Sequence, residues 1–201
     1  MVSPFALAAD FPDPVLDAKP GATSPQIAVL AGGCFWCTEV VFEYVAGVSE
    51  VVSGYAGGTK ESARYDAVSA GATNHAEVIQ VKFDPAKVSY GQILKIFFAV
   101  AHDPTQLNRQ GPDWGKQYRS EIFYADEEQK KVAEAYIAQV DQAKVFSGKI
   151  VTRVSALEKF YPAEGYHQDF VKRNPNHGYV VVHALPKVEK LKKNFPGKVK
   201  K

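Results

Sequence analysis

Two kinds of hydrophobic spacing alternate along the chain. Short stretches in which apolar residues cluster or alternate with polar ones predict strands, and they lie at 26–30, 48–53, 78–83, 119–124 and 150–154. Longer stretches with an apolar residue at every third or fourth position predict helices, and they run from 34 to 45, after Ser89 and after Asp126. Ser89 and Asp126 each precede a glutamine by three positions, a spacing typical of capped helix starts.

The order of these elements predicts the fold class. The first six run strand, helix, strand, strand, helix, strand. This is the order of the split βαβ, or ferredoxin-like, plait, in which both helices cover one face of a mixed sheet. We therefore predict a two-layer α+β fold. Two long polar segments, 54–74 and 102–117, interrupt the pattern and are candidate functional loops.

The two ends of the chain lack this periodicity. Residues 1–25 carry five prolines and predict an irregular N-terminal arm, while seven lysines within 187–201 predict a solvated basic tail over 186–201. The catalytic domain is then expected at 26–185. The string at 6–10 resembles the end of an export signal, but no basic segment precedes it. We expect a cytoplasmic protein, or an exported one if a signal has been clipped.

Composition and charge exclude several classes of protein. The 201 residues are 46% hydrophobic and 23% charged, which suits a folded domain with a sizeable core. The net charge of +2 gives no general attraction for nucleic acid. No apolar run approaches the roughly 18 residues of a membrane span, and two cysteines cannot make a disulfide-rich scaffold. We expect a monomeric enzyme with no nucleic-acid or membrane partner.

The candidate chemistry starts at Cys34, which follows two glycines where a predicted strand gives way to a helix. The positive end of the helix dipole favours the thiolate at such a position. Phe35 and Trp36 follow directly and would wall the thiol with apolar surface. Two structural alternatives remain: a buried core cysteine, or half of a zinc site with Cys37, although no two histidines have finger spacing.

The run at 32–36, Gly-Gly-Cys-Phe-Trp, resembles the signature of the A-type peptide methionine sulfoxide reductases. Further strings similar to the family's stand in the family's order at 53–58, 74–78, 102–105, 108–113, 117–120 and 160–168. The resemblance covers about residues 26–180. It implies reduction of methionine S-sulfoxide, free or in proteins, to methionine, a repair of oxidative damage that needs no bound cofactor.

The resemblance also implies a role for each matching residue. Cys34 matches the nucleophile, which would become a sulfenic acid, and Phe35 and Trp36 match the pocket for the S-methyl group. Glu77 matches the acid, with three polar companions: Tyr65, Asp113 and Tyr118. Burial in an apolar pocket would raise the pKa of Glu77 and keep it protonated near neutrality. Pro112 stands where the family usually has Asn, which leaves the conformation of this loop open.

Two routes could regenerate Cys34. Relatives often carry a resolving cysteine near the C-terminal end, but residues 174–179 contain none. Cys37 lies one helical turn from Cys34, so the pair could form a disulfide for thioredoxin to reduce. Otherwise Cys37 is inert, and an external thiol such as glutathione or glutaredoxin acts on the sulfenic acid. We favour Cys37.

Two other functions fit parts of the pattern. A thioredoxin-like dithiol oxidoreductase also uses a C-x-x-C motif at a helix start, but it would leave Glu77 and the tyrosines unexplained. A peptide-binding plait that uses a sheet edge or the basic tail would need no reactive thiol.

Overall fold

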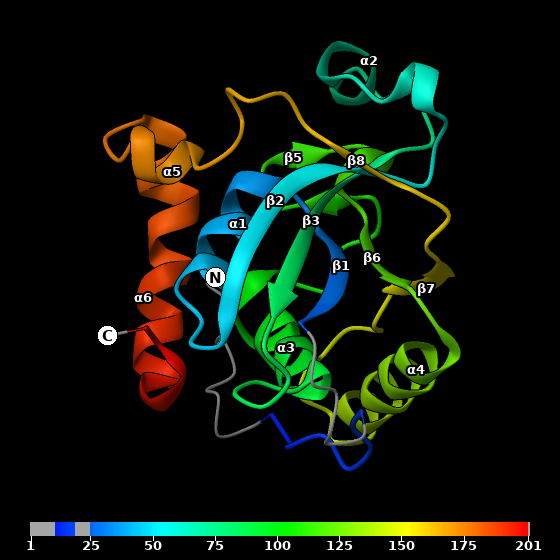
Figure 1. The fold of residues 1–201 in the computed structure, drawn as a ribbon, viewed down its shortest axis with the longest axis vertical. Helices are drawn as coiled ribbons and strands as arrows, with labels where there is room; N and C mark the ends of the chain where they lie inside the picture. Colours follow the sequence, from blue (N-terminus) through cyan, green and yellow to red (C-terminus); the bar gives the residue numbers. More distant parts are fainter. Residues whose placement is uncertain (1–10, 19–24, 201) are drawn as a thin grey trace.

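The computed structural model describes residues 11–18 and 25–200 (Figure 1). Its main sheet has six strands in the order β7-β6-β1-β3-β2-β8. They are β1 (Gln26–Gly32), β2 (Val48–Ala56), β3 (Ala76–Phe83), β6 (Ser120–Tyr124), β7 (Arg153–Ala156) and β8 (Phe160–Pro162). All neighbouring pairs are antiparallel except β6 and β7, so the sheet is mixed, as predicted for the α+β class. A separate hairpin joins β4 (Arg109–Gln110) to β5 (Asp113–Trp114).

The α-helices of the described residues are α1 (Phe35–Glu43), α2 (Tyr65–Ser69), α3 (Tyr90–Ile96), α4 (Glu127–Gln142), α5 (Phe170–Arg173) and α6 (Leu185–Asn194). Two helix starts confirm their predicted caps. Ser89 and Gln92 exchange the two hydrogen bonds of a capping box before α3. The Asp126 carboxylate accepts the backbone N–H of Gln129 before α4.

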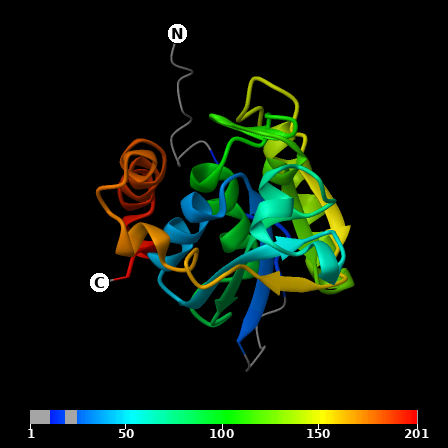
Figure 2. The same ribbon diagram turned by 90° about the horizontal axis from the view of Figure 1, so that it is seen from above.

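The sheet buries both of its faces, and alternation along β1 shows how. Leu30 shares one core with residues of α1, α3 and α4. Val29 points to the other face, where it packs with Phe123 and is covered by Leu157 and Phe160. Figure 2 shows α1 and α3 on the same side of the sheet. Because α1 starts directly after β1, this packing fixes the position of Cys34 at the end of the sheet.

The last predicted strand begins later than expected. The pattern predicts a strand at 150–154, but β7 covers Arg153–Ala156 and pairs in parallel with β6. Val151 instead donates its backbone N–H to the carbonyl of Pro104, at 2.8 Å. Val151, in the first part of the predicted strand, is therefore bonded to the loop after α3 and not to the sheet.

The prediction of a solvated basic tail at 186–201 is wrong. Residues Leu185–Asn194 form α6, in which Val188 and Leu191 are buried. Val188 and Leu191 are three positions apart, a helical spacing. The lysines around them dominate the composition of the segment. Lys187 anchors the helix by donating to the carbonyl of Ala101, at 2.6 Å.

Of the predicted N-terminal arm, residues 11–18 form no helix or strand, and they pack on the domain. Phe11 is buried against Phe146, with ring centroids 5.6 Å apart. Asp17 accepts the backbone N–H of Gly91 at 2.8 Å. The string at 6–10 lies outside the described residues. Within the described part of the chain, no helix combines the length and apolar character needed to cross a bilayer.

Candidate active site

Cys34 occupies the N-cap of α1, directly after the turn that ends β1. The turn requires a glycine, since Gly33 has a φ of +90° and an added Cβ would lie 2.4 Å from the side chain of Gln110. The carbonyl of Cys34 accepts the backbone N–H of Cys37 at 3.1 Å. Cys34 keeps 9% of its surface exposed and Cys37 keeps 2%, so a reagent in solution reaches Cys34 first.

Glu77 reaches the same helix start from β3. Its Oε2 atom accepts the backbone N–H of Phe35 at 3.0 Å, which places the carboxyl group beside the Cys34 position. The side chain is buried. Burial raises the pKa of Glu77 to about 8, as expected from the sequence, although the Phe35 N–H opposes the shift. The group is therefore mostly protonated at neutral pH and can donate a proton.

Phe35 and Trp36 form an aromatic wall next to this pair. Phe35 is buried and Trp36 is half-buried. The Trp36 ring stacks on Phe170 of α5, with centroids 3.7 Å apart and planes at 5°. Its indole N–H donates to His167 Nδ1 at 3.2 Å, and the His167 ring lies 5.0 Å from that of Phe35. His167, just before α5, and Phe170, in α5, thus hold the aromatic wall in place.

The predicted tyrosines lie around Glu77. Burial and then the charge of Glu77 raise the pKa of both Tyr65 and Tyr118, which places the two phenols near this carboxyl group. Tyr65 is fixed by Glu164, which accepts its backbone N–H at 2.9 Å and the hydroxyl of Tyr55 at 2.8 Å. Both phenols therefore feel the charge of Glu77 and are candidate donors to an oxygen bound beside it.

Asp113 enters from the β4–β5 hairpin. Its Oδ2 atom accepts the hydroxyl of Tyr179 at 2.5 Å, and the thiol of Cys37 donates to the same hydroxyl at 3.9 Å. Pro112 is exposed at the hairpin turn after Gly111, which has a φ of +58°. The exchange of the family's Asn for Pro thus leaves Asp113 directed into the site.

The described part of the chain offers the two thiols no partners for a metal site. Among residues 11–18 and 25–200, no three His, Cys, Asp or Glu side chains are grouped so as to hold a metal ion. The described structure therefore does not support Cys34 and Cys37 as half of a zinc site.

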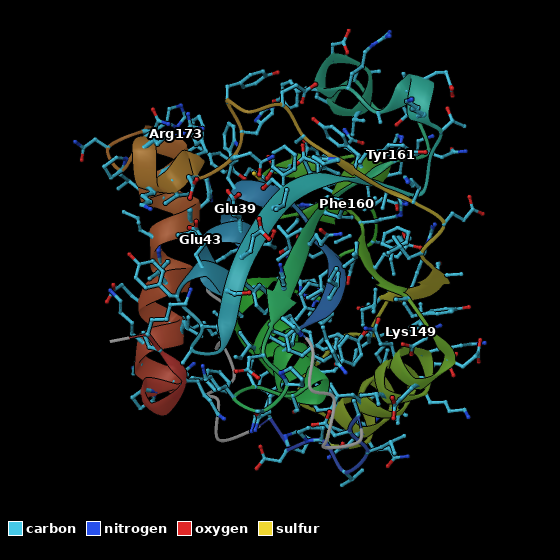
Figure 3. The ribbon with its side chains drawn as sticks, viewed as in Figure 1. Glu39, Glu43, Lys149, Phe160, Tyr161 and Arg173 are labelled. Carbon is cyan, nitrogen blue, oxygen red and sulfur yellow. The ribbon has the colours of Figure 1, made fainter. Side chains whose placement is uncertain are left out.

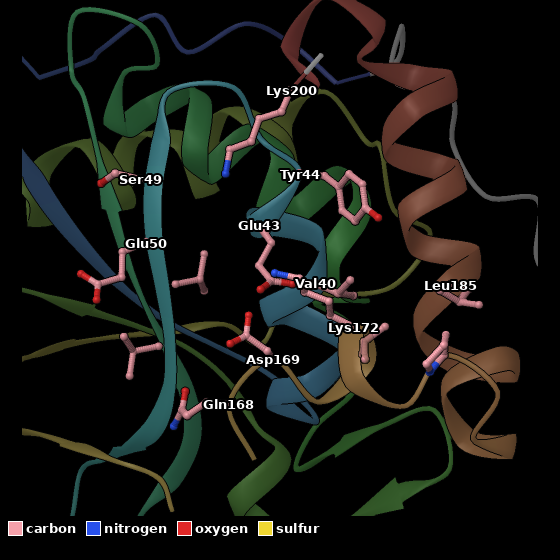
Figure 4. Close-up of a pocket in the computed structure, with 14 residues that line it drawn as sticks. Val40, Glu43, Tyr44, Ser49, Glu50, Gln168, Asp169, Lys172, Leu185 and Lys200 are labelled. Atoms are coloured by element: carbon pink, nitrogen blue, oxygen red, sulfur yellow. The ribbon is translucent and has the colours of Figure 1, made fainter. Parts of the chain in front are cut away.

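A second group of carboxyls, of which Glu39 is buried and Glu43 is half-buried, lies farther along α1. Glu39 and Glu43 project from this helix beside β2 (Figure 3). A cavity of about 950 Å³ opens here, and Glu43, Asp169 and Lys200 are among the residues that line it (Figure 4). Burial raises the pKa of Glu39 to about 8 and that of Glu43 to about 7. The walls of this cavity do not include either cysteine.

Comparison with known proteins decides which chemistry this geometry serves. A family model described as peptide methionine sulfoxide reductase matches residues 26–199. The chain is 53% identical to peptide methionine sulfoxide reductase MsrA 2 of Synechocystis sp., over 100% of this chain and 94% of that protein. The chain belongs to the peptide methionine sulfoxide reductase family. The reductase is of the A type and converts methionine sulfoxide to methionine, so the rival dithiol oxidoreductase function is not supported.

Other relatives and solved structures agree. The MsrA of Haloquadratum walsbyi is 49% identical over 87% of this chain and 98% of that protein. The crystal structure of reduced Mxr1 from Saccharomyces cerevisiae matches with a TM-score of 0.68, 32% identity, and coverage of 79% of this chain and 90% of that one. Methionine sulfoxide reductase A of Corynebacterium diphtheriae matches with a TM-score of 0.65, 33% identity, and coverage of 82% of each chain.

The pKa values of the two thiols of the reductase are shifted in opposite directions. Burial, together with Cys37 and Glu77, raises the pKa of Cys34 above its ordinary value. The hydrogen bond from Cys34 lowers the pKa of Cys37 to about 7, and the charge of Lys187 acts in the same direction. Burial therefore opposes the effect of the helix terminus, which favours a Cys34 thiolate. Of the two thiols, Cys37 therefore loses its proton first as the pH rises.

Sequence reasoning assigned no role to four residues of the reductase's site. They are Glu164, His167, Phe170 and Tyr179, which fix Tyr65, Trp36 and Asp113. Glu164 and His167 belong to the family-like string at 160–168, so a signal for them was present. Tyr179 lies in the segment 174–179, and no motif in the sequence marks it as a site residue.

Proposed function

We propose that the chain reduces the S epimer of methionine sulfoxide, free or within proteins, through a sulfenic acid on Cys34. The observation that carries this proposal is the convergence of Cys34 and the buried Glu77 carboxyl at one helix start, where Phe35 N–H binds Glu77 at 3.0 Å. A thiol nucleophile and a neutral carboxylic acid are the two groups that sulfoxide reduction requires. The aromatic wall offers apolar rings to the methyl group and the phenols offer hydroxyls to the oxygen, a difference that favours one epimer.

The first step transfers the sulfoxide oxygen to Cys34. Cys37 takes the Cys34 proton through their shared hydrogen bond, and Glu77 gives its proton to the sulfoxide oxygen. Tyr65 and Tyr118 stabilise that oxygen by hydrogen bonds. The Cys34 sulfur attacks the substrate sulfur, the substrate S–O bond breaks, and the oxygen finishes as a hydroxyl on Cys34. The substrate sulfur gains two electrons, the Cys34 sulfur loses them, and methionine leaves.

The second step forms a disulfide between Cys34 and Cys37. Cys37 lies on the same helical turn, since its N–H donates to the Cys34 carbonyl at 3.1 Å. Its sulfur attacks the Cys34 sulfur and the hydroxyl leaves as water. A dithiol partner of the thioredoxin class then reduces the disulfide and restores both thiols. Direct reduction of the sulfenic acid by glutathione or glutaredoxin is the competing route, and a free Cys37 after turnover would favour it.

We also propose that the central strands form a ferredoxin-like plait. Its support is the order β6-β1-β3-β2, with α1 joining β1 to β2 and α3 lying between β3 and β6 in the sequence. In this arrangement the outer strands β7 and β8 are additions at the two edges.

A single-turnover experiment with separate epimers tests the proposed reaction. The chain is mixed without reductant with a peptide that contains either methionine S-sulfoxide or methionine R-sulfoxide. One methionine per chain from the S epimer, with the loss of both thiols, is the expected result. Equal reduction of the R epimer, or no methionine from either, would contradict the proposal.

A further inference from the structure

Two hydrogen bonds connect Cys37 to a carboxylate in the active site. The Cys37 thiol donates to the hydroxyl of Tyr179 at 3.9 Å, and that hydroxyl donates to Asp113 Oδ2 at 2.5 Å. The two bonds form a chain in one direction, because Cys37 donates to Tyr179 and Tyr179 donates to Asp113. A phenol in such a position can pass a proton by accepting one and releasing its own.

The three groups come from different parts of the chain and are held in place. Cys37 is on α1, Asp113 is on the β4–β5 hairpin, and Tyr179 lies just before the turn that leads into α6. The Tyr179 ring lies 6.1 Å from Trp36 and 4.7 Å from His183, in each case between ring centroids. Tyr179 is half-buried, so its hydroxyl has little freedom to leave this pair of partners.

The proposed second step creates a need for such a connection. After the first step Cys37 holds the proton taken from Cys34, and a thiol is a far weaker nucleophile than a thiolate. Cys37 is 2% exposed, so bulk water has little access to remove this proton. Lys187, anchored on the Ala101 carbonyl, adds a positive charge that favours the Cys37 thiolate.

We propose that Tyr179 is a catalytic residue of the disulfide-forming step, which carries the Cys37 proton to Asp113. The inference rests on the proposed role of Cys37 as the resolving thiol. Cys37 gives its proton to the Tyr179 oxygen while Tyr179 gives its own to Asp113. The Cys37 sulfur then forms the bond to the Cys34 sulfur, the S–O bond of the sulfenic acid breaks, and Asp113 returns the proton to the departing hydroxyl. One water leaves, and no other reactant is needed.

The test measures sulfenic acid against disulfide in the Tyr179→Phe variant. One equivalent of a methionine S-sulfoxide peptide is mixed with the full chain without reductant, and samples are quenched with dimedone for mass spectrometry. Near pH 6.5 we expect Tyr179→Phe to form the disulfide about 100-fold more slowly, with trapped sulfenic acid on Cys34. Near pH 9 the thiolate forms without the path, so the difference should shrink to about threefold or less.

Tyr44→Phe is the matched control, because it removes a phenol hydroxyl at the other end of the same helix. It should form the disulfide at the wild-type rate at both pH values. Disulfide formation by Tyr179→Phe at the wild-type rate near pH 6.5 would overturn the inference. An equal slowing at both pH values would also overturn it, because a purely structural defect has no reason to disappear at high pH.

The wild-type arm separates this inference from the function on which it rests. If wild type forms methionine but keeps Cys37 free, the resolving role of Cys37 is wrong and the inference falls with it. If wild type forms no methionine, the proposed reaction itself is wrong. A second measurement keeps the proposal testable if Tyr179→Phe alone folds poorly. It compares the Cys34→Ser chain with and without Tyr179→Phe. The added substitution should raise the pH at which Cys37 alkylation reaches half its maximal rate. An unchanged profile would contradict the proposal.

Discussion

Glu77 and Glu39 are both buried carboxyl groups whose pKa is raised to about 8, chiefly by burial, yet only one of them adjoins a nucleophile. Glu77 meets the start of α1 next to Cys34. Glu39 lies one turn along the same helix and accepts the backbone N–H of Asp169 at 3.3 Å. Burial accounts for the raised pKa at both positions. The neighbouring groups, and not the shift itself, therefore distinguish a catalytic acid from a structural one.

The largest expected effect in this comparison is that of Cys34→Ser. A hydroxyl is ionised far too weakly to attack sulfur, so sulfoxide reduction should fall by more than about 10³-fold. The measurement is methionine formed per chain under excess dithiothreitol. Activity within about tenfold of wild type would remove Cys34 from its role.

The matched substitutions Glu77→Gln and Glu39→Gln separate the two carboxyls directly. Each replaces a protonated acid with an amide of the same shape. Glu77→Gln should lower the single-turnover rate by about 10²–10⁴-fold, because the sulfoxide oxygen loses its proton donor. Glu39→Gln should change the same rate by about threefold or less.

Two results would break this comparison. Normal turnover by Glu77→Gln across neutral pH would exclude it as the acid. If Glu39→Gln lowered the single-turnover rate as much as Glu77→Gln, then Glu39 would take part in the chemistry. Alkylation of Cys34 by iodoacetamide in both variants checks that the helix start is intact.

Cys37→Ser should separate the two halves of the reaction. The variant should still convert one equivalent of sulfoxide, because the oxygen is transferred to Cys34. Turnover with thioredoxin should fall by at least about tenfold, because thioredoxin attacks disulfides. Dithiothreitol should restore turnover by reaching the sulfenic acid itself. Wild-type turnover of Cys37→Ser with thioredoxin would show that the C-x-x-C spacing is incidental.

The smallest expected effect concerns the stability contributed by Glu39. Its folded-state pKa of about 8 lies above the unfolded value, which is about 4.3. The contribution is therefore fully present below about pH 4.3 and is lost as the pH rises through about 8. Glu39→Gln should raise the free energy of unfolding by about 1–3 kcal/mol at pH 9 relative to wild type, and by less at pH 6. Urea unfolding at both pH values measures this, and an equal change at both would contradict the assigned titration.

The sequence predicts local features of this molecule better than distant ones. The caps at Ser89 and Asp126 and the start of α1 after Gly33 depend on residues a few positions apart. The hydrogen bond from Trp36 to His167 joins residues 131 positions apart. The pattern alone does not place them together, and only the family-like strings suggested that both belong to the site.

Two further features, the buried face of α6 and the pKa order of the two thiols, were not predicted from the sequence. The lysines after 186 concealed the apolar stripe of α6, whose Leu191 is fully buried. The proton order within the thiol pair also escaped the sequence, because the helix dipole favours a Cys34 thiolate whereas burial opposes it. Which effect wins depends on how deeply the fold encloses Cys34, and the packing of α5 and α6 against α1 sets that depth.

The transfer of oxygen from substrate to Cys34 is the central claim, and isotope labelling tests it most directly. The Cys37→Ser chain is mixed with one equivalent of a methionine S-sulfoxide peptide that carries heavy oxygen. The Cys34 sulfenic acid is then trapped with a reagent that retains its oxygen. We predict that mass spectrometry finds the heavy isotope on Cys34 in an amount equal to the methionine formed. Heavy oxygen found only in water, with unlabelled Cys34, would contradict attack by the Cys34 sulfur followed by transfer of the sulfoxide oxygen.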